Sequence, residues 1–249
     1  EKGEAVPVSV VLPADLDTPL SAYLKLGGSR GFILESCLGG ERFGRYSHVG
    51  TSPVGHLRLD SQGGTLWRGG ESRRLDGKPL DVLRGVWRDN AVAMLPGEPP
   101  FVGGLVGYLG YNCMPWFERH VPDRHASDVT FPDSEWLLCD DFVTLDSRTQ
   151  TLHATAIARP SRHGSVAQAL ADAQARAESI AQRLLRPLPP EVYAPAPQAT
   201  GELEVKVAWD RAGYEAAVER VKEYIRAGDC MQVVLARRFE ARGAPPPLS

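Results

Sequence analysis

The sequence lacks any apolar run long enough to cross a membrane. Its longest runs, residues 8–12 and 101–106, fall far short of the ~20 residues that a spanning helix needs. The N-terminal stretch EKGEAVPVSV has neither the basic start and apolar core nor the cleavage-like site of a secretory signal. It also does not begin with Met, which leaves room for earlier residues in the natural chain. We therefore expect a cytoplasmic protein with no membrane part.

The sequence also lacks a large charge of either sign. The formal net charge is -3 and the sequence pI is about 6.1, so nothing in the composition attracts nucleic acid or an anionic membrane surface. The hydrophobic content of 43% is enough for a substantial core in one or two domains. Small molecules or proteins are the partners that this composition favours.

Metal-binding spacing is absent as well. The cysteines are far apart and never in the pairs typical of zinc sites, and we interpret each as a small buried side chain: Cys37, Cys113, Cys139 and Cys230. His120 and His125 lie in ERHVPDRH, among Pro and charged residues, which favours solvated loop histidines. We predict no metal ligand in this chain.

Common catalytic motifs are missing too. The only Gly-Lys pair is followed by Pro79, so there is no phosphate-binding loop, and neither G-x-S-x-G nor H-E-x-x-H occurs. GGLVGYLGY (103–111) does not have the glycine order of a dinucleotide site, and its glycines favour close backbone packing. Asp140 and Asp141 are adjacent on a predicted strand and point to opposite faces, so they cannot act together. No catalytic residue is predicted.

The residues that are present predict alternating strands and helices up to residue 88. Residues 6–12 favour a strand, and Asp17-Thr18-Pro19 supplies the cap and first turn of a helix. Short β-rich runs separated by Gly, Ser and Pro then predict an antiparallel meander over 31–68. Residues 79–88 favour a short helix with Leu80, Leu83 and Trp87 on its apolar face.

A hairpin and a long helix follow. Residues 134–158 hold two β-rich runs around Asp146-Ser147-Arg148-Thr149-Gln150, which predicts a β-hairpin. Ser165 can cap a helix that continues to about Arg186, with apolar residues at spacings of three and four. Together these elements predict an α+β (mixed α/β) fold in which antiparallel sheets pack with helices.

The proline-rich stretch PLPPEVYAPAPQATG predicts an extended linker over residues 187–201. After it we expect a strand over 203–207, a helix from Asp210 to Gly228 and a strand over 231–236 with an aggregation-prone edge. A unit of this size cannot bury itself, so we expect the chain to be the front part of something longer.

The stretch FILES raises the question of why an apolar run ends in an acid and an alcohol. Leu34, Glu35 and Ser36 can simply mark a strand that reaches the surface. Alternatively, the strand end delivers polar groups to the edge of a core. The pattern alone leaves both interpretations open.

Three segments together, FILESCLGGERFGRYSHVG (32–50), GGLVGYLGY (103–111) and EYIRAGDCMQVVLARRF (223–239), resemble component I of anthranilate synthase. Their order covers nearly the whole chain. The resemblance implies a chorismate-utilising α/β enzyme that forms anthranilate with Mg²⁺ and ammonia, the ammonia coming from a glutamine amidotransferase subunit. It also implies feedback inhibition by L-tryptophan.

By the same resemblance, residues 1–186 form an N-terminal regulatory domain, and residues 202–249 begin the chorismate-binding catalytic domain. The motifs that carry the metal carboxylates and the chorismate contacts in the family are absent, so the Mg²⁺ ligands are expected beyond residue 249. We expect this stretch to be inactive alone.

The resemblance places Leu34, Glu35 and Ser36 in the tryptophan inhibitor site, with Arg45 of the R-Y-S segment near it. This is chemically reasonable, because an apolar strand end can hold an indole. A carboxylate and a hydroxyl can bind the ammonium group of a free amino acid.

Two departures leave the product open. Cys230-Met231 stands where the synthase often has an isoleucine and an aromatic residue, and Ala236 stands where serine is usual. A cysteine there also occurs in the aminodeoxychorismate synthase of folate biosynthesis. The R-Y-S segment and V-V-L favour the tryptophan pathway. A non-catalytic amino-acid-binding module is the third possibility.

Overall fold

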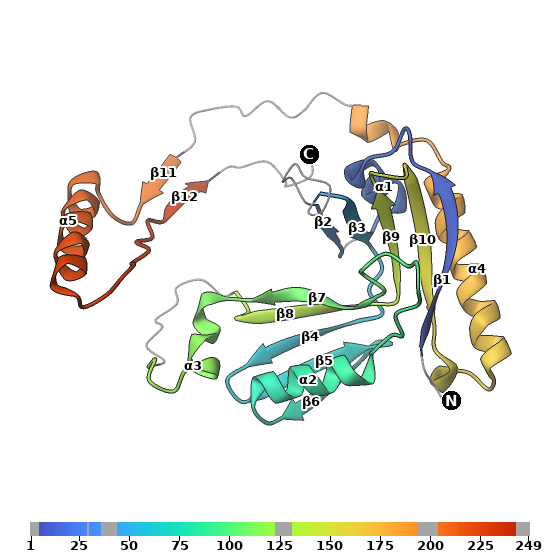
Figure 1. The fold of residues 1–249 in the computed structure, drawn as a ribbon, viewed down its shortest axis with the longest axis horizontal. Coiled ribbons are helices and arrows are strands. Elements are labelled where there is room, and N and C mark those ends of the chain that lie inside the picture. The colour runs from blue at the N-terminus through green and yellow to red at the C-terminus, as the bar shows by residue number, and fades with distance from the viewer. Residues whose placement is uncertain (1–4, 29, 36–43, 123–130, 194–203, 243–249) are drawn as a thin grey trace. The chain divides into compact units, whose positions relative to one another are not determined.

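The computed structural model describes residues 5–28, 30–35, 44–122, 131–193 and 204–242 (Figure 1). The chain divides into two compact units, Glu1–Pro189 and Pro190–Ser249. The described residues form the predicted α+β fold, with antiparallel sheets and packed helices.

The first unit contains two five-stranded sheets, and every strand pair in them is antiparallel. The first sheet has the order β1 (Val6–Pro13), β10 (Thr151–Ala158), β9 (Asp141–Asp146), β3 (Tyr46–Gly50) and β2 (Phe32–Leu34). The second has the order β6 (Glu71–Asp76), β5 (Gly63–Arg68), β4 (Gly55–Asp60), β8 (Ser134–Cys139) and β7 (Gly104–Leu109).

The chain passes between these sheets at two points, and this corrects the prediction of one meander over 31–68. Strand β3 belongs to the first sheet and β4 to the second, with residues 51–54 between them. In the same way β8 and β9 are separated at Asp140 and enter different sheets. Short β-rich runs predict strands, but the sheet that β3 or β4 joins depends also on partners 75 to 100 residues away.

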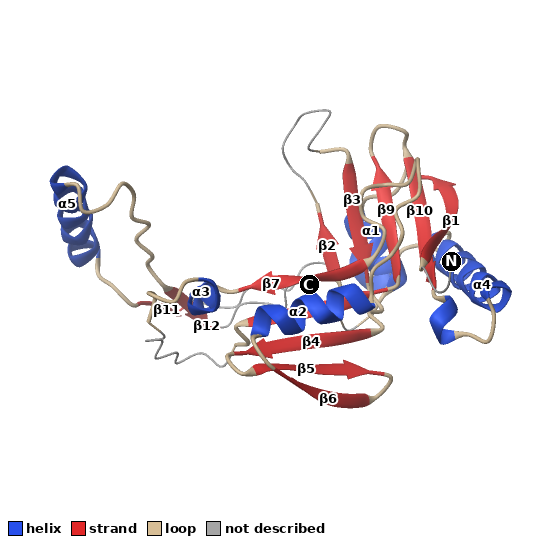
Figure 2. Ribbon diagram, turned by 60° about the horizontal axis from the view of Figure 1, so that its bottom comes forward, coloured by secondary structure: helices blue, strands red, loops and turns tan. Residues whose placement is uncertain are grey.

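Two helices cover one face of the first sheet (Figure 2). Helix α1 (Pro19–Leu26) begins at the predicted cap Thr18, and α4 (Val166–Leu184) begins at the predicted cap Ser165. Both caps accept a hydrogen bond from a first-turn backbone N–H, which satisfies a group that the helix itself leaves unpaired. Small side chains let α4 pack closely on β1 and β10: Ala169, Ala173 and Ala177 are fully buried against Ala156 and Ala158.

Helix α2 (Pro79–Asp89) packs on the second sheet with part of the predicted face, since Leu83 contacts the core and Trp87 does not. Val82 and Val86 are buried with Leu57 and Leu138, whereas Trp87 is 56% exposed. The prediction was wrong for Trp87. A large aromatic side chain dominates the apparent hydrophobicity of its helical face, but the residues buried most deeply here are the smaller Val82 and Val86.

The segment GGLVGYLGY forms strand β7 and the residues after it, not a nucleotide loop. Gly107 lies against β8, where an added Cβ would meet the Glu135 carbonyl oxygen and would lie 2.7 Å from the Cα of Trp136. The predicted close backbone packing is therefore confirmed at this position. Short helical turns follow at Tyr111–Cys113, α3 (Met114–Phe117), Pro160–Arg162 and Pro190–Tyr193.

Polar side chains join the two sheets where the chain crosses between them. Asp140 is only 4% exposed, and both of its oxygens accept hydrogen bonds from Arg159, at 2.6–3.0 Å. Arg162 donates to the same carboxylate at 2.6 Å. Arg159 also donates to the backbone oxygen of Asn90, at the C-terminal end of α2. Asp141 points the other way and pairs with Arg176 of α4, so the two adjacent carboxylates are separate, as predicted.

The second unit contains β11 (Glu204–Val207), α5 (Arg211–Ala227) and β12 (Phe239–Arg242). Asp210 caps α5, and Gly228 ends it with a φ of 84°, a left-handed conformation that suits glycine. β11 pairs with β12, while residues 231–236 contain no strand. The predicted strand there was wrong, because β-rich residues form a strand only when a neighbour pairs with their backbone.

Candidate functional site

The predicted inhibitor site lies on the hairpin of β2 and β3. These strands pair antiparallel, with Leu34 directly opposite His48. Leu34 is 44% exposed at the end of β2, and Glu35 follows it as an exposed residue. Ser36 lies outside the described residues. The assignment of these three residues to a binding site stays a prediction.

Arg45 has a defined partner in the structure. Its Nε donates to Asp146 Oδ1 at 2.8 Å and its Nη2 donates to Asp146 Oδ2 at 2.6 Å, a two-point ion pair. The guanidinium also lies 4.7 Å from the centre of the Tyr46 ring. Asp146 is 4% exposed, and its hydrogen bonds from Arg45 hold the pKa of its carboxyl well below the usual range. Arg45 is therefore fixed to the end of β9, at the end of the hairpin where the chain connects β2 to β3.

The face of the first sheet away from α4 carries a mixed aromatic and polar surface. Cross-strand partners share a face, which places Leu34, His48 and Thr144 in one row. His48 Nδ1 lies 2.9 Å from Thr144 Oγ1. Phe101 lies in the segment between α2 and β7. The centre of its ring is 5.1 Å from the centre of the His48 ring and 4.8 Å from that of Phe142.

Burial keeps the His48 imidazole neutral. It lowers the pKa of His48 to about 4, so the ring is uncharged at neutral pH and can both donate and accept one hydrogen bond. Its neighbours Thr144 and Phe142 are 0% and 2% exposed, so the ring lies in a packed cluster.

Sequence reasoning missed His48, Thr144 and Asp146. The signal was available in part, because alternate residues of YSHVG and DFVTLD must share a face of their strands. What the pattern could not show is that β3 and β9 are neighbours.

The remaining predicted candidates are distributed through the chain. Cys113 and Cys139 are buried as predicted, and burial raises the pKa of their thiols to about 11 and about 12. Cys230 is partly exposed, and Cys37 and His125 lie outside the described residues. The side chain of His120 is 96% exposed.

Within the described ranges, no group of three or more His, Cys, Asp or Glu side chains is arranged to hold a metal ion. In those same ranges, every helix is too short or too polar to span a bilayer.

Comparison with known proteins places the chain in a family. The model of the chorismate binding enzyme family matches residues 33–249. The chain belongs to this family. It is 37% identical to the anthranilate synthase component 1 of Pseudomonas aeruginosa over 247 residues. This aligned region covers 96% of the chain and 49% of that protein. It is 33% identical over 248 residues to the protein of that name from Synechocystis, with 96% and 49% covered.

A solved structure shares the fold. Anthranilate synthase component I from Streptococcus pneumoniae matches with a TM-score of 0.57 and 24% identity, over 95% of this chain and 50% of that one. The chain therefore spans about half the length of the relatives that it matches. The resemblance noted in the three sequence segments is confirmed at the level of the family.

Proposed function

We propose that this chain is part of component I of an anthranilate synthase. The complete protein would convert chorismate to anthranilate in tryptophan biosynthesis, with Mg²⁺ and with ammonia from a glutamine amidotransferase subunit, in the cytoplasm. The observation that supports this is the 37% identity, over nearly the whole chain, to a protein named anthranilate synthase component 1. The match to the chorismate binding enzyme model supports chorismate as the substrate.

The same proposal assigns feedback inhibition by L-tryptophan to this portion of the protein. Leu34 would contact the indole, and Glu35 with Ser36 would bind the ammonium group. Glu35 is exposed at the end of β2 and so is available to a ligand. Arg45 would act by holding the hairpin on Asp146, since at least two of its nitrogens already donate to that carboxylate.

Calorimetry with L-tryptophan on the complete protein tests the regulatory assignment. Glu35→Gln removes the charge that would pair with the ammonium group, and we expect an affinity about tenfold lower or weaker still. Ser36→Ala should weaken binding less. Glu71→Gln, an exposed glutamate on β6, is the matched control and should bind as the unaltered protein does. Equal affinity for tryptophan in Glu35→Gln and Glu71→Gln would remove Glu35 from the site.

Aminodeoxychorismate synthase of folate biosynthesis is the second candidate, because Cys230 and Ala236 depart from the synthase pattern. Product analysis separates the two. We expect the complete protein, given chorismate, Mg²⁺ and ammonium, to release fluorescent anthranilate. Accumulation of aminodeoxychorismate without anthranilate would favour the folate pathway instead.

A further inference from the structure

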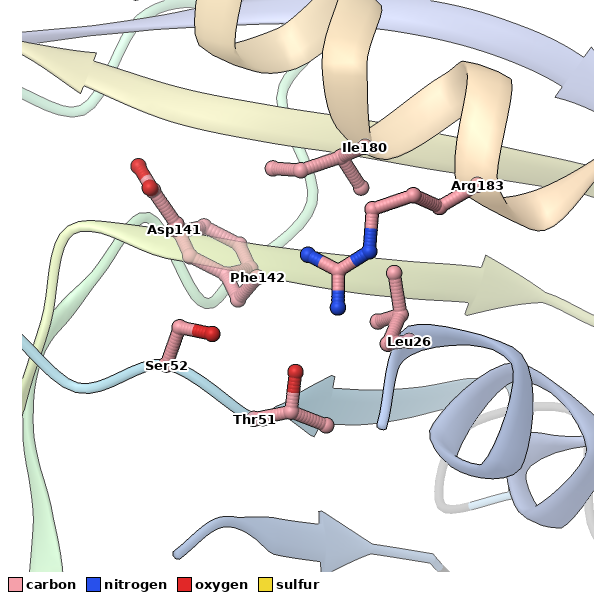
Figure 3. A pocket seen from close by; sticks show the side chains of 7 residues that line it. All are labelled: Leu26, Thr51, Ser52, Asp141, Phe142, Ile180 and Arg183. Carbon is pink, nitrogen blue, oxygen red and sulfur yellow. The ribbon is translucent and has the colours of Figure 1, made fainter. Parts of the chain in front are cut away.

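A small cavity lies beside the first sheet, between it and the helices α1 and α4 (Figure 3). Its walls come from α1, α4, the start of β9 and the residues that follow β3. It is lined by Leu26, Thr51, Ser52, Asp141, Phe142, Ile180 and Arg183. Three of these side chains are apolar, so a charge in the cavity is partly removed from water.

The Arg183 guanidinium extends from α4 into this cavity, toward Thr51 and Phe142 (Figure 3). Arg183 is partly buried, and within the described residues its guanidinium has no hydrogen bond or ion pair. A partly desolvated cation without a partner costs free energy, which a bound anion would offset.

Among the described residues that line the cavity, the carboxylate of Asp141 already has an ion-pair partner. Asp141 forms an ion pair with Arg176, which lies about two turns before Arg183 on α4. Arg176 also donates to Asp172 at 2.8 Å and to the Ile157 carbonyl oxygen at 2.7 Å, which fixes it beside Asp141. Arg176 is thus shared by two carboxylates, and Arg183 is left with no ion pair of its own within the described residues.

Two hydroxyl groups complete the lining of the cavity. Thr51 is 6% exposed, and neither its hydroxyl nor that of Ser52 has a hydrogen-bond partner within the described part of the chain. Figure 3 shows both hydroxyls on the side of the cavity that faces Arg183. A guanidinium opposite two hydroxyl donors is an arrangement that recognises oxygen or halide anions.

The size of the cavity limits the ligand. The centre of a water-sized sphere can move over about 30 Å³ in it, roughly two to three times the 10–15 Å³ that one water needs on this measure. A free amino acid or a phosphate ester does not fit this volume, whereas chloride, nitrate or formate matches it in scale.

We propose that this cavity is a binding site for a small monovalent anion, held by Arg183 with Thr51 and Ser52. The ion would connect α4 to the segment that leaves β3, and so would stabilise the first sheet together with its helices.

Thermal unfolding of the full chain tests the proposal. The quantity to compare is the difference in unfolding midpoint between sodium nitrate and sodium gluconate at equal ionic strength, since gluconate is too large for the cavity. We expect the midpoint to rise by about 2–4 °C as nitrate saturates the site. Thr51→Val keeps the shape of the side chain but removes the hydroxyl. We expect this variant to need a higher nitrate concentration to reach half of the rise in unfolding midpoint.

Arg183→Gln should abolish the nitrate-specific rise, while Arg186→Gln, an exposed arginine near the end of the same helix, should retain it. General effects of salt on unfolding cancel in this comparison. An equal rise in Arg183→Gln and in the unaltered chain would overturn the proposal.

If Arg183→Gln does not fold, crystals of the unaltered chain in sodium bromide decide the question. An anomalous bromide peak in the cavity supports the site. A water at that position, with no anomalous peak, overturns it.

Discussion

At the scale of single residues, neighbours in sequence have unrelated roles. Asp140 and Asp141 differ only in which side of the chain they face, yet one joins the two sheets and the other holds a helix. Burial alone would raise the pKa of Asp140, and the guanidinium groups of Arg159 and Arg162 outweigh it, so this pKa lies below its ordinary value. The carboxylate is thus charged at neutral pH inside the protein.

Removing that charge should be costly. In Asp140→Asn, Arg159 keeps its charge at 5% exposure and loses its counter-ion. We expect the free energy of unfolding to fall by about 3–5 kcal/mol, measured by urea denaturation at pH 7. Asp60→Asn removes a partner of Arg74 in a pair that is 39% and 53% exposed, so the loss should be much smaller than in Asp140→Asn. Similar losses in the two variants would mean that burial does not set the strength of the Asp140 pair.

His48 predicts a pH dependence with a definite sign. Its folded-state pKa of about 4 lies below the ordinary 6.5, so the unfolded chain binds a proton first as the pH falls. The contribution of His48 to stability is therefore complete above about pH 6.5 and declines between pH 6.5 and 4.

As the pH falls from 7.5 to 5, we expect the urea midpoint of His48→Gln to decrease less than that of the unaltered chain. His120→Gln, whose side chain is exposed in the folded protein, should follow the unaltered chain. A His48→Gln variant with an unchanged pH profile would show that the ring is not desolvated.

At the scale of elements, local signals set where helices begin, and close contact sets where glycine is required. The caps at Thr18, Ser165 and Asp210 each accept a backbone hydrogen bond in the first turn, as their residue types predict. Gly107 in β7 has a different cause, because the backbone of β8 occupies the space of a side chain.

Two glycine substitutions should therefore change stability in opposite directions. Gly107→Ala forces β7 away from β8, and we expect a loss of about 1–3 kcal/mol in the free energy of unfolding. Gly85→Ala in α2 meets no atom within 4 Å and improves helix propensity, so a gain of about 0.5–1 kcal/mol is expected. Urea denaturation of both variants measures this; a neutral Gly107→Ala would argue against the tight β7–β8 contact.

At the scale of the whole molecule, the chain covers about half of its relatives, and its described residues present no metal-binding group. The resemblance to component I of anthranilate synthase implies that the Mg²⁺ ligands and the reacting groups lie beyond residue 249, and the proposed function requires this. The described residues of this chain form antiparallel sheets packed with helices.

The chain of 249 residues should accordingly be unable to turn over chorismate. With chorismate, Mg²⁺ and ammonium we expect no rise in anthranilate fluorescence, whereas the complete protein should give one. Fluorescence from the purified chain that disappears after heat denaturation would contradict this division of roles.

Local signals were enough to predict the type and most boundaries of the elements, because caps, turn residues and apolar spacing act within a few residues. The sequence also determined the family, through motifs such as FILES and GGLVGYLGY. Long-range contacts could be seen only in the folded protein. β3 and β9 are neighbours, which brings His48 to Thr144 and Arg45 to Asp146. Arg183 likewise enters a cavity whose other walls come from distant parts of the sequence. These contacts join residues up to about 130 positions apart, and strand pairing at that separation depends on how the whole chain packs.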